Sequence, residues 1–379
     1  MNASATGSST RIIRDTHLGL RRERMRASPQ ARDGRFRNLD DVRPDLKGLA
    51  PAIAGEFIFR GSQRAPSAPL PAHDPRALWM RAPETGLRIT WLGHSTLLLE
   101  IDGVRILTDP VFGDRASPFS FMGPKRFHPV PVPLADLPPV DIVLLSHDHY
   151  DHLCRQTFTQ LARSHVQVVT ALGVGAHLEH YGVNHEQIHE LDWHESIELP
   201  GVRFTATPAQ HFSGRGLNDR NSTLWASWVI ETERHKLFFS GDTGLFSGFS
   251  DIGEKYGPFD LTLLEIGAYH PAWGTIHLGP DNALKAHQML KGRVLLPVHW
   301  GTFDLALHKW NEPAEQLFKV AADSGSKLFM PMLGQALEPQ RTPEVTPWWR
   351  NAQSPQPLST KVAEPAALEA PLHEPQESL

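Results

Sequence analysis

Residues 141–153, DIVLLSHDHYDHL, decide the fold class and point to a metal centre. An apolar stretch typical of a buried strand runs into a turn that carries His147, His149, Asp151 and His152. Alternate residues of an extended segment share one face, so His147 and His149 can reach the same metal ion. Asp151 and His152 follow where the chain is expected to turn into a helix, so they can face a second ion. With 21 histidines in 379 residues, a chance match to these four positions is on the order of a few per thousand.

Three further ligand candidates follow apolar stretches in the same way. A side chain just past the end of a strand is held firmly, while the loop beyond it leaves room for a substrate. A lone histidine at such a place is usually structural, but these three and the first motif together supply seven ligands, enough for two ions. The three are His211 after residues 202–205, Asp242 after 236–239 and His299 after 294–298.

Short apolar runs recur from residue 87 onward, each closed by a turn-forming residue. Their Val, Ile, Leu and Phe content predicts strands, and helical patterns over 173–181, 280–291 and 312–324 lie between several of them. Strands mixed with helices at this spacing predict a layered α/β fold. The expected strands are 87–91, 96–101, 105–108, 141–145, 167–170, 202–205, 223–231, 236–239, 261–265 and 294–298.

The two ends of the chain differ in composition from its centre. Residues 1–50 hold eleven basic residues against six acidic ones, although the whole chain has a net charge of −5, and residues 62–75 are rich in proline. We therefore expect a partly disordered basic leader and connector over 1–75, a folded domain over 76–340, which the resemblance described below makes the catalytic domain, and a disordered Pro- and Glu-rich tail over 341–379. The basic leader is either a solvated arm or a contact with anionic lipid or nucleic acid.

The sequence also excludes several classes of protein. No stretch approaches the roughly 18 consecutive apolar residues of a transmembrane helix. The single cysteine, Cys154, excludes an intramolecular disulfide framework and fits a reducing, cytoplasmic location. We expect Cys154 to be a buried structural thiol. Residues 185–189, HEQIH, match the HExxH protease pattern, but Gly182 precedes them closely and 188–191 begin a strand pattern, so we assign no protease.

The seven ligand candidates resemble, in type and order, those of the metallo-β-lactamase superfamily of dinuclear metal hydrolases. Longer stretches between residues 88 and 335 resemble the branch that contains N-acylphosphatidylethanolamine-hydrolysing phospholipase D. These stretches are WLGHSTLLLEIDGVRILTDPVF (91–112), RASPFSFMGPKRF (115–127), LPPVDIVLLSHDHYDHL (137–153), SGDTG (240–244), GPFDLTLLEIGAYHPAW (257–273) and HWGTF (299–303). The resemblance implies an α/β fold, namely an αββα sandwich with the metal site at one edge of the two sheets.

The resemblance also implies a role for each ligand. Histidine and carboxylate without thiolate suit two zinc ions, while iron and manganese remain open. His94 in GHST and Asp109 in TDP are expected to support the ligands from behind, or to be hydrogen-bonded turn residues. One ion would be held by His147, His149 and His211, the other by Asp151, His152 and His299, and Asp242 would bridge the two.

Further residues are expected near the substrate. The family carries a histidine near the substrate headgroup, and His277 matches that position best. We expect His277 to contact the substrate or to donate a proton, with a plain loop histidine as the alternative. Tyr150 could bond a phosphate oxygen or only pack its ring, and Lys125 with Arg126 could face an anionic headgroup or form a surface ion pair. The expected catalytic residues are Asp151, Asp242 and His277.

The function implied by the resemblance is hydrolysis of a phosphodiester at two metal ions. A phospholipase D of this kind releases N-acylethanolamine and phosphatidic acid from N-acylphosphatidylethanolamine. A lactone or a small cyclic phosphodiester is the alternative substrate, and a lipid- or RNA-binding module with a vestigial site is the non-enzymatic alternative, which the intact ligand set disfavours.

The partners expected from this function are a phospholipid or another small molecule and the inner face of a membrane. A homodimer is compatible with the sequence, and nucleic acid is not expected. The eukaryotic enzyme's membrane-docking N-terminal region has no clear counterpart in residues 1–75. Because the basic leader could contact anionic lipid, removing residues 1–60 is expected to weaken vesicle binding and to spare hydrolysis of soluble diesters.

Overall fold

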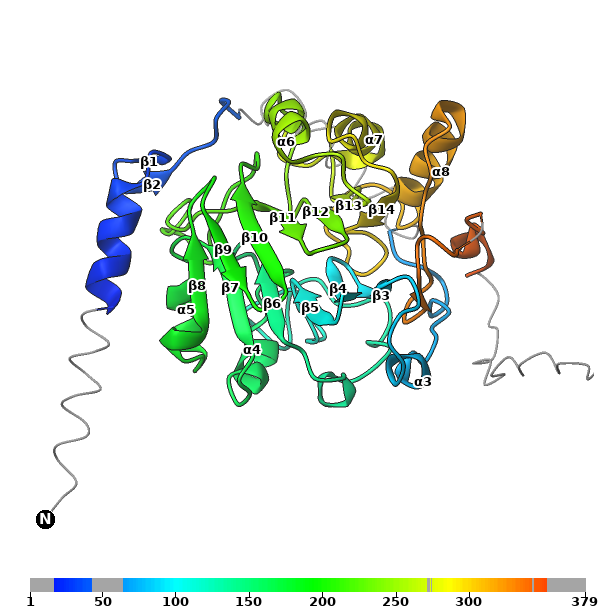
Figure 1. The fold of residues 1–379 in the computed structure, drawn as a ribbon, viewed down its shortest axis with the longest axis horizontal. Helices are drawn as coiled ribbons and strands as arrows, with labels where there is room; N and C mark the ends of the chain where they lie inside the picture. Colours follow the sequence, from blue (N-terminus) through cyan, green and yellow to red (C-terminus); the bar gives the residue numbers. More distant parts are fainter. Residues whose placement is uncertain (1–16, 43–63, 271–272, 274, 343, 353–379) are drawn as a thin grey trace, which may run out of the picture.

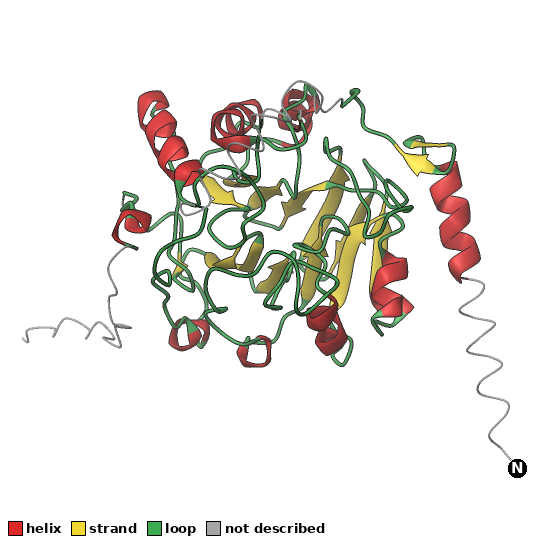
Figure 2. Ribbon diagram, turned by 180° about the vertical axis from the view of Figure 1, so that it is seen from behind, coloured by secondary structure: helices red, strands yellow, loops and turns green. Residues whose placement is uncertain are grey.

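The protein is built from two mixed β-sheets packed face to face between layers of helices (Figures 1 and 2). The computed structural model describes residues 17–42, 64–270, 273, 275–342 and 344–352. One sheet has seven strands in the order β15-β3-β4-β5-β6-β7-β8, and the other has six in the order β14-β13-β12-β11-β10-β9. The predicted αββα sandwich is therefore confirmed.

The seven-stranded sheet joins an antiparallel half to a parallel half. Strands β15, β3, β4 and β5 pair antiparallel, whereas β5 to β8 pair parallel. Every residue of β4 and β6 is buried, as expected for strands that are covered on both faces. The strands are β3 Leu87–Gly93, β4 Thr96–Ile101, β5 Val104–Thr108, β6 Ile142–Leu145, β7 Gln167–Ala171, β8 Ile188–Leu191 and β15 Ala336–Leu337.

The six-stranded sheet has the same mixed design. Strands β9 to β12 pair antiparallel, and β12, β13 and β14 pair parallel. Because the carboxyl ends of parallel strands meet at one edge of a sheet, the loops after β12, β13 and β14 start close together. The strands are β9 Ser196–Leu199, β10 Val202–Thr207, β11 Ser227–Glu231, β12 Lys236–Phe239, β13 Leu261–Glu265 and β14 Leu295–Val298.

Helices cover the outer faces of both sheets. Two short helices, α4 (Arg155–Leu161) and α5 (Gly175–His180), lie beside β6 to β8, while α6 (Gly248–Tyr256) and α7 (Gly279–Met289) lie over β11 to β14 (Figure 1). Helix α8 (Glu312–Ser324) packs against α7. The smaller elements are α3 Arg76–Trp79, the hairpin β1 Ala31–Arg32 and β2 Arg35–Phe36, and single 3-10 turns at Leu134–Asp136, His185–Gln187 and Trp348–Asn351.

The structure differs from one expected strand and shows how the HEQIH segment folds. The strand expected over 223–231 begins only at Ser227, because the preceding residues bond to other loops, with Leu224 N donating to Leu172 O at 2.8 Å. The HEQIH segment forms a 3-10 turn that runs into β8. Its two histidines do not share a helix, so the segment lacks the geometry that the HExxH pattern requires.

The ordered chain continues past residue 340, where a disordered tail was expected to begin. Trp348 and Trp349 are both buried, and Trp348 packs against Trp91 and Trp300, with ring centroids 6.1 and 5.6 Å apart. Trp349 also donates its indole N–H to Glu315 at 2.7 Å. Two large aromatic side chains thus hold residues 344–352 on the domain. The remainder of the expected tail, 353–379, lies outside the described residues.

Part of the expected leader also packs on the domain. Residues 17–27 are helical, and Arg21 in this helix is buried between Glu179 and Glu190, at 2.6 and 2.5 Å. The rest of the expected leader and connector, 1–16 and 43–63, lies outside the described residues. No helix in the described part of the chain is both long and apolar enough to cross a membrane.

Candidate metal centre

The predicted ligands converge at one edge of the sandwich because each follows the end of a strand. The first motif begins directly after β6, and the other three ligands come from the loops that follow β10, β12 and β14. Because β6 belongs to one sheet and β10, β12 and β14 belong to the other, the centre lies between loops of both sheets. The seven side chains brought together are His147, His149, Asp151, His152, His211, Asp242 and His299.

One group of ligand atoms gathers around His149. Its Nδ1 lies 2.8 Å from Nε2 of His147 and 3.2 Å from Nε2 of His211. Together with Asp242, these residues offer ligand atoms that all lie within 4.8 Å of one another. The expected grouping of His147, His149 and His211 is therefore the one that the structure contains.

The second group gathers around Asp151. Its Oδ2 lies 3.2 Å from Nε2 of His299 and 3.5 Å from Nε2 of His152. His94 belongs to the same group, with its Nε2 3.0 Å from Asp151 Oδ2. The contact with Asp151 fits the supporting role expected of His94, and the tight β3–β4 turn, with φ +55° at His94, also brings its Nε2 within reach of the same ion.

Asp242 stands between the two groups. Its Oδ2 lies 3.1 Å from His299 Nε2 and 3.2 Å from His152 Nε2. The same oxygen lies 3.7 Å from His211 Nε2 and 3.9 Å from His147 Nε2. A carboxylate at this position can serve both groups at once.

The surroundings of these residues fit a bound cation. His152 Nε2 and Asp242 Oδ1 are buried without a hydrogen-bond partner among the described residues, an arrangement that is costly unless an ion or a water completes it. Burial lowers the pKa of His147 and His211 well below the ordinary value, which keeps them neutral and able to bind a metal. Burial also opposes charge on His299, but Asp242 and Asp151 raise its pKa to about 10, so positive charge is favoured at this spot.

Asp109 holds two ligands from behind, as expected of a supporting residue. Its Oδ2 lies 2.6 Å from Nδ1 of His152 and accepts a hydrogen bond of 2.6 Å from Ser146 Oγ. The same Ser146 hydroxyl lies 2.9 Å from His147 Nδ1. These contacts occupy the Nδ1 atoms and leave the Nε2 atoms of both imidazoles for the centre.

His277 lies beside the centre and is paired with a glutamate that sequence reasoning missed. His277 Nδ1 is 2.7 Å from Oε2 of Glu265, whose other oxygen accepts from the backbone N–H of Thr243 at 2.7 Å. Glu265 is fully buried. It is the last residue of β13, and the rule that found the other ligands considered only His and Asp just past a strand end. Extending that rule to glutamate at the strand end would have found it.

Tyr150 contacts Arg215 through both its hydroxyl and its ring. Its hydroxyl donates to the backbone oxygen of Arg215 at 2.8 Å, and the Arg215 guanidinium lies 3.9 Å from the centre of its ring. The packing role expected for its ring is present in the structure, and the contact with a phosphate oxygen stays a prediction. Arg126 is likewise buried and donates to the carbonyls of Val111 and Gly113, so it forms no surface ion pair.

The N-terminal segment contributes a contact that no local pattern could reveal. Asn38 donates from Nδ2 to the backbone oxygen of His211 at 2.8 Å and accepts from the His211 N–H at 3.0 Å. Nearby, Phe36 N donates to Asn221 O at 2.8 Å. The expected leader thus braces the loop that carries a ligand.

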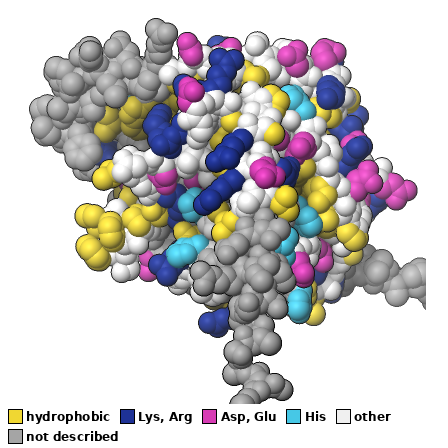
Figure 3. Space-filling model, turned by 90° about the vertical axis from the view of Figure 1, so that its left-hand side faces the viewer, with side chains coloured by type: hydrophobic (Ala, Val, Ile, Leu, Met, Phe, Trp, Pro, Cys, Tyr) yellow, Lys and Arg dark blue, Asp and Glu magenta, His cyan; other side chains and the backbone are white. Residues whose placement is uncertain are grey.

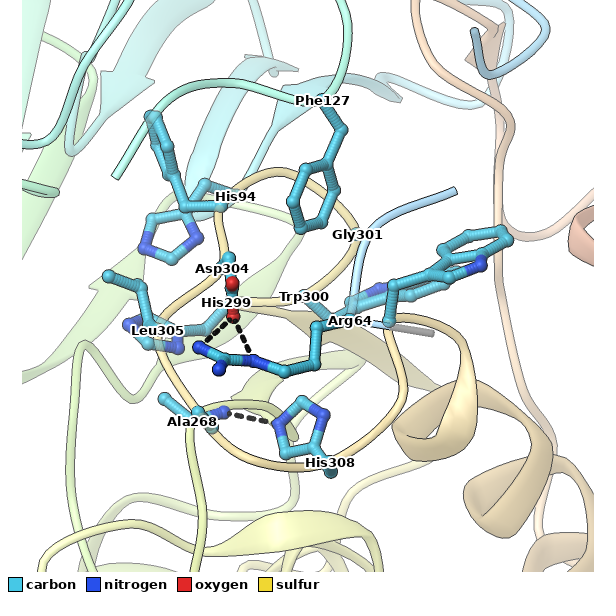
Figure 4. Close-up of a pocket in the computed structure, with 13 residues that line it drawn as sticks. Arg64, His94, Phe127, Ala268, His299, Trp300, Gly301, Asp304, Leu305 and His308 are labelled. Carbon is cyan, nitrogen blue, oxygen red and sulfur yellow. Dashed lines mark hydrogen bonds and ion pairs between the residues drawn. The ribbon is translucent and has the colours of Figure 1, made fainter. Parts of the chain in front are cut away.

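A small cavity opens beside His94 and His299 (Figure 4). Its volume of about 20 Å³ is roughly that needed for one water molecule. An ion pair of 2.8 Å between Arg64 and Asp304 borders it, and His308 accepts from the Ala268 N–H at 3.0 Å on the other side (Figure 4). The cavity adjoins the centre on the side of the loop that follows β14.

Fold and site define a metal-dependent hydrolase with the metallo-β-lactamase fold. Residues 104–300 match the family described as "Beta-lactamase superfamily domain", and the chain belongs to this family. An uncharacterised protein of Mycobacterium tuberculosis is 46% identical over 85% of this chain and 88% of its own length.

Other relatives bear names that describe a reaction. The N-acyl-phosphatidylethanolamine-hydrolyzing phospholipase D 1 of Caenorhabditis elegans is 40% identical over 62% of this chain and 69% of its own length. A mitochondrial enzyme of the same name from Saccharomyces cerevisiae is 35% identical over 65% of this chain and 54% of its own length. Among solved structures, a metallo hydrolase from Ignicoccus hospitalis aligns with a TM-score of 0.51 and 25% identity over 66% of this chain and 97% of that one.

Proposed function

We propose that this protein binds two zinc ions and hydrolyses N-acylphosphatidylethanolamine as a phospholipase D, releasing N-acylethanolamine and phosphatidic acid. The observation that carries the proposal is the position of Asp242 between two ligand groups. The likeness to the nematode phospholipase supports the choice of substrate. We further propose that the protein works at the cytoplasmic face of a membrane, where this lipid would be met.

The ligand groups define which residues would hold each ion. His147, His149 and His211 would hold one, Asp151, His152 and His299 the other, and Asp242 would contact both. Paired divalent ions supply a nucleophilic water at neutral pH and neutralise the charge that builds up on a phosphoryl group. Imidazole and carboxylate ligands without a thiolate suit zinc.

The residues around the ligands would orient the ligand imidazoles and protonate the leaving group. Asp109 and Ser146 fix the ring planes of His152 and His147, so the ligand atoms need no rearrangement during the reaction. Glu265 holds His277 through Nδ1. The Nε2 of His277 is therefore the atom that would hand a proton to the leaving alkoxide oxygen.

Product analysis tests this function. Zinc-loaded protein is incubated with N-acylphosphatidylethanolamine, and the products are identified by mass spectrometry beside the Asp242→Ala variant. Metal-dependent release of N-acylethanolamine that is absent in the variant supports the proposal. No release from fully loaded protein contradicts the lipid substrate, and the same assay then turns to lactones and small cyclic phosphodiesters.

A further inference from the structure

A loop beside the metal centre carries three large apolar side chains into solvent. Residues 115–125, here called the apolar finger, expose 47% of Phe119, 77% of Phe121 and 55% of Met122. The two phenyl rings lie 5.6 Å apart, so the exposed side chains form one patch. Exposed apolar residues that gather in this way usually mark a contact surface. Figure 3 shows one face of the molecule, where exposed hydrophobic side chains gather at the left edge beside basic and histidine side chains.

The finger is braced from within. Arg115 donates from Nε to Ser120 O at 3.1 Å and from Nη1 to Gly123 O at 2.6 Å. The two limbs pair through Ala116 N, which donates to Pro124 O at 3.0 Å. Gly123 adopts φ +98°, and a Cβ there would meet the Ser117 side chain at 2.7 Å. The apolar tip is therefore presented to solvent by a defined backbone.

The base of the finger is tied to the metal centre. Directly after the finger, Phe127 N donates to Thr302 O at 2.9 Å, three residues from His299. At the start of the finger, Ala116 packs in a small apolar cluster with Phe303. The ring of Phe303 lies 5.2 Å from the ring of His94. A surface that receives the finger would therefore lie next to the centre.

The charges near the tip suit an anionic surface. Arg115 and Lys125 close the finger at its two ends, residues 115–125 contain no acidic side chain, and the exposed Asp114 is the one acidic residue directly beside them in the chain. Neither cation forms an ion pair within the described ranges. Two basic side chains beside an exposed apolar tip add electrostatic attraction to an anionic bilayer surface, about 1 kcal/mol for each, to the gain from burying the apolar side chains.

We propose that the apolar finger docks the protein on anionic membranes by inserting Phe119, Phe121 and Met122 among the lipids. This inference rests on the proposed lipid substrate, which must be reached at a bilayer. The shape of the finger favours lipid over a protein partner, because a stable protein interface buries about 800 Å² per partner. A single narrow loop offers a few side chains, which suffice for shallow insertion into a fluid layer.

Vesicle partitioning tests the docking directly. Wild-type protein is mixed with vesicles of phosphatidylcholine containing phosphatidylglycerol, beside a triple variant with Phe119→Ser, Phe121→Ser and Met122→Ser. We expect the triple variant to partition at least tenfold less, while hydrolysis of soluble bis(p-nitrophenyl) phosphate stays unchanged. Leu217→Ser is the matched control, because Leu217 is a fully exposed apolar residue in another loop. Equal partitioning of the triple variant and the wild type overturns the proposal.

A fluorescent reporter tests insertion itself. The label NBD is attached to Phe121→Cys or to Leu217→Cys, since the native Cys154 is buried. We expect a blue shift and quenching by spin-labelled lipids at position 121 and neither at position 217. A signal at both positions or at neither overturns the proposal. Both tests read binding rather than turnover, so the finger can be confirmed even where N-acylphosphatidylethanolamine is not cleaved.

Discussion

Asn38 and His211 are joined by two hydrogen bonds although 173 residues separate them. The Asn38 side chain pairs with the backbone N–H and C=O of His211 as a neighbouring strand would, and it also accepts from the indole N–H of Trp225 at 3.2 Å. Removing residues 1–60 would therefore remove a support of the metal centre. The expectation that this deletion spares hydrolysis is revised accordingly: hydrolysis of soluble diesters should fall.

The Asn38→Ala variant isolates this contact. We expect turnover to fall about 10- to 100-fold, together with the affinity for the ion that His147, His149 and His211 would hold. Losing a residue that supports a metal ligand typically costs this much. Metal retained after dialysis against a weak chelator and turnover of a soluble diester are the measurements. Asn184→Ala is the control, because Asn184 is exposed and caps a distant 3-10 turn. Wild-type metal retention in Asn38→Ala would contradict the role.

The His277→Ala variant tests proton donation. We expect a loss of about 100-fold for substrates with an alkyl leaving group, because general-acid catalysis typically contributes 10²–10⁴-fold. Diesters that release p-nitrophenol need little protonation, so their turnover should change much less. Comparing kcat for the two substrate types at constant metal content is the measurement. An equal loss on both would assign His277 to binding or structure instead.

Trp349 reports on the C-terminal segment. It is fully buried and contacts Trp300 and Phe318, with ring centroids 5.8 and 5.9 Å apart. Replacing a large buried aromatic residue by alanine costs about 3–5 kcal/mol, and we expect a loss of this size in the free energy of unfolding of Trp349→Ala. Urea denaturation measures it, with the exposed Met80→Ala as control. A decrease of less than about 1 kcal/mol in the free energy of unfolding would show that residues 344–352 contribute little to stability.

His287 makes stability depend on pH. Burial lowers the pKa of His287 from 6.5 to about 4, and its Nδ1 lies 2.7 Å from Thr262 Oγ1. Between these two pH values the unfolded chain binds the proton and the folded chain does not, so stability falls as pH drops from 6.5 to 4. The free energy of unfolding should therefore fall by about 2 kcal/mol between pH 7.5 and pH 5 because of His287.

Replacing His287 by glutamine should remove this part of the acid sensitivity. Urea unfolding at pH 7.5 and pH 5 gives the stability difference for each protein. The exposed His180→Gln variant is the control and should behave as the wild type does. The same pH dependence in His287→Gln and in the wild type would contradict the assignment.

Much of the centre could be predicted because its ligands follow a local rule. His211, Asp242 and His299 each stand just past a strand whose apolar pattern is visible in the sequence, and the fold brings these strand ends together. Glu265 was not predicted because it is the last residue of a buried strand, inside the apolar stretch rather than after it. His94 was expected only as a support of the ligands. The backbone of a tight turn, rather than sequence spacing, aims its ring at the centre, so no sequence pattern indicated how close to the ligands it would lie.

The ends of the chain could not be predicted, for a different reason. Basic and proline-rich composition indicates disorder on average, but single contacts decide whether a segment packs. Asn38 and Arg21 hold the N-terminal segment, and Trp348 and Trp349 hold the C-terminal one. Such contacts join residues far apart in the chain, so no window of sequence contains both partners.

The metal content of Asp242→Ala tests the central claim, that one carboxylate serves two ligand groups. Zinc is measured by inductively coupled plasma mass spectrometry after gel filtration, with circular dichroism to confirm the fold. The account predicts two zinc ions per wild-type chain, and at most one in the folded variant, together with loss of hydrolysis. Two tightly held ions and near-normal hydrolysis in Asp242→Ala would contradict it.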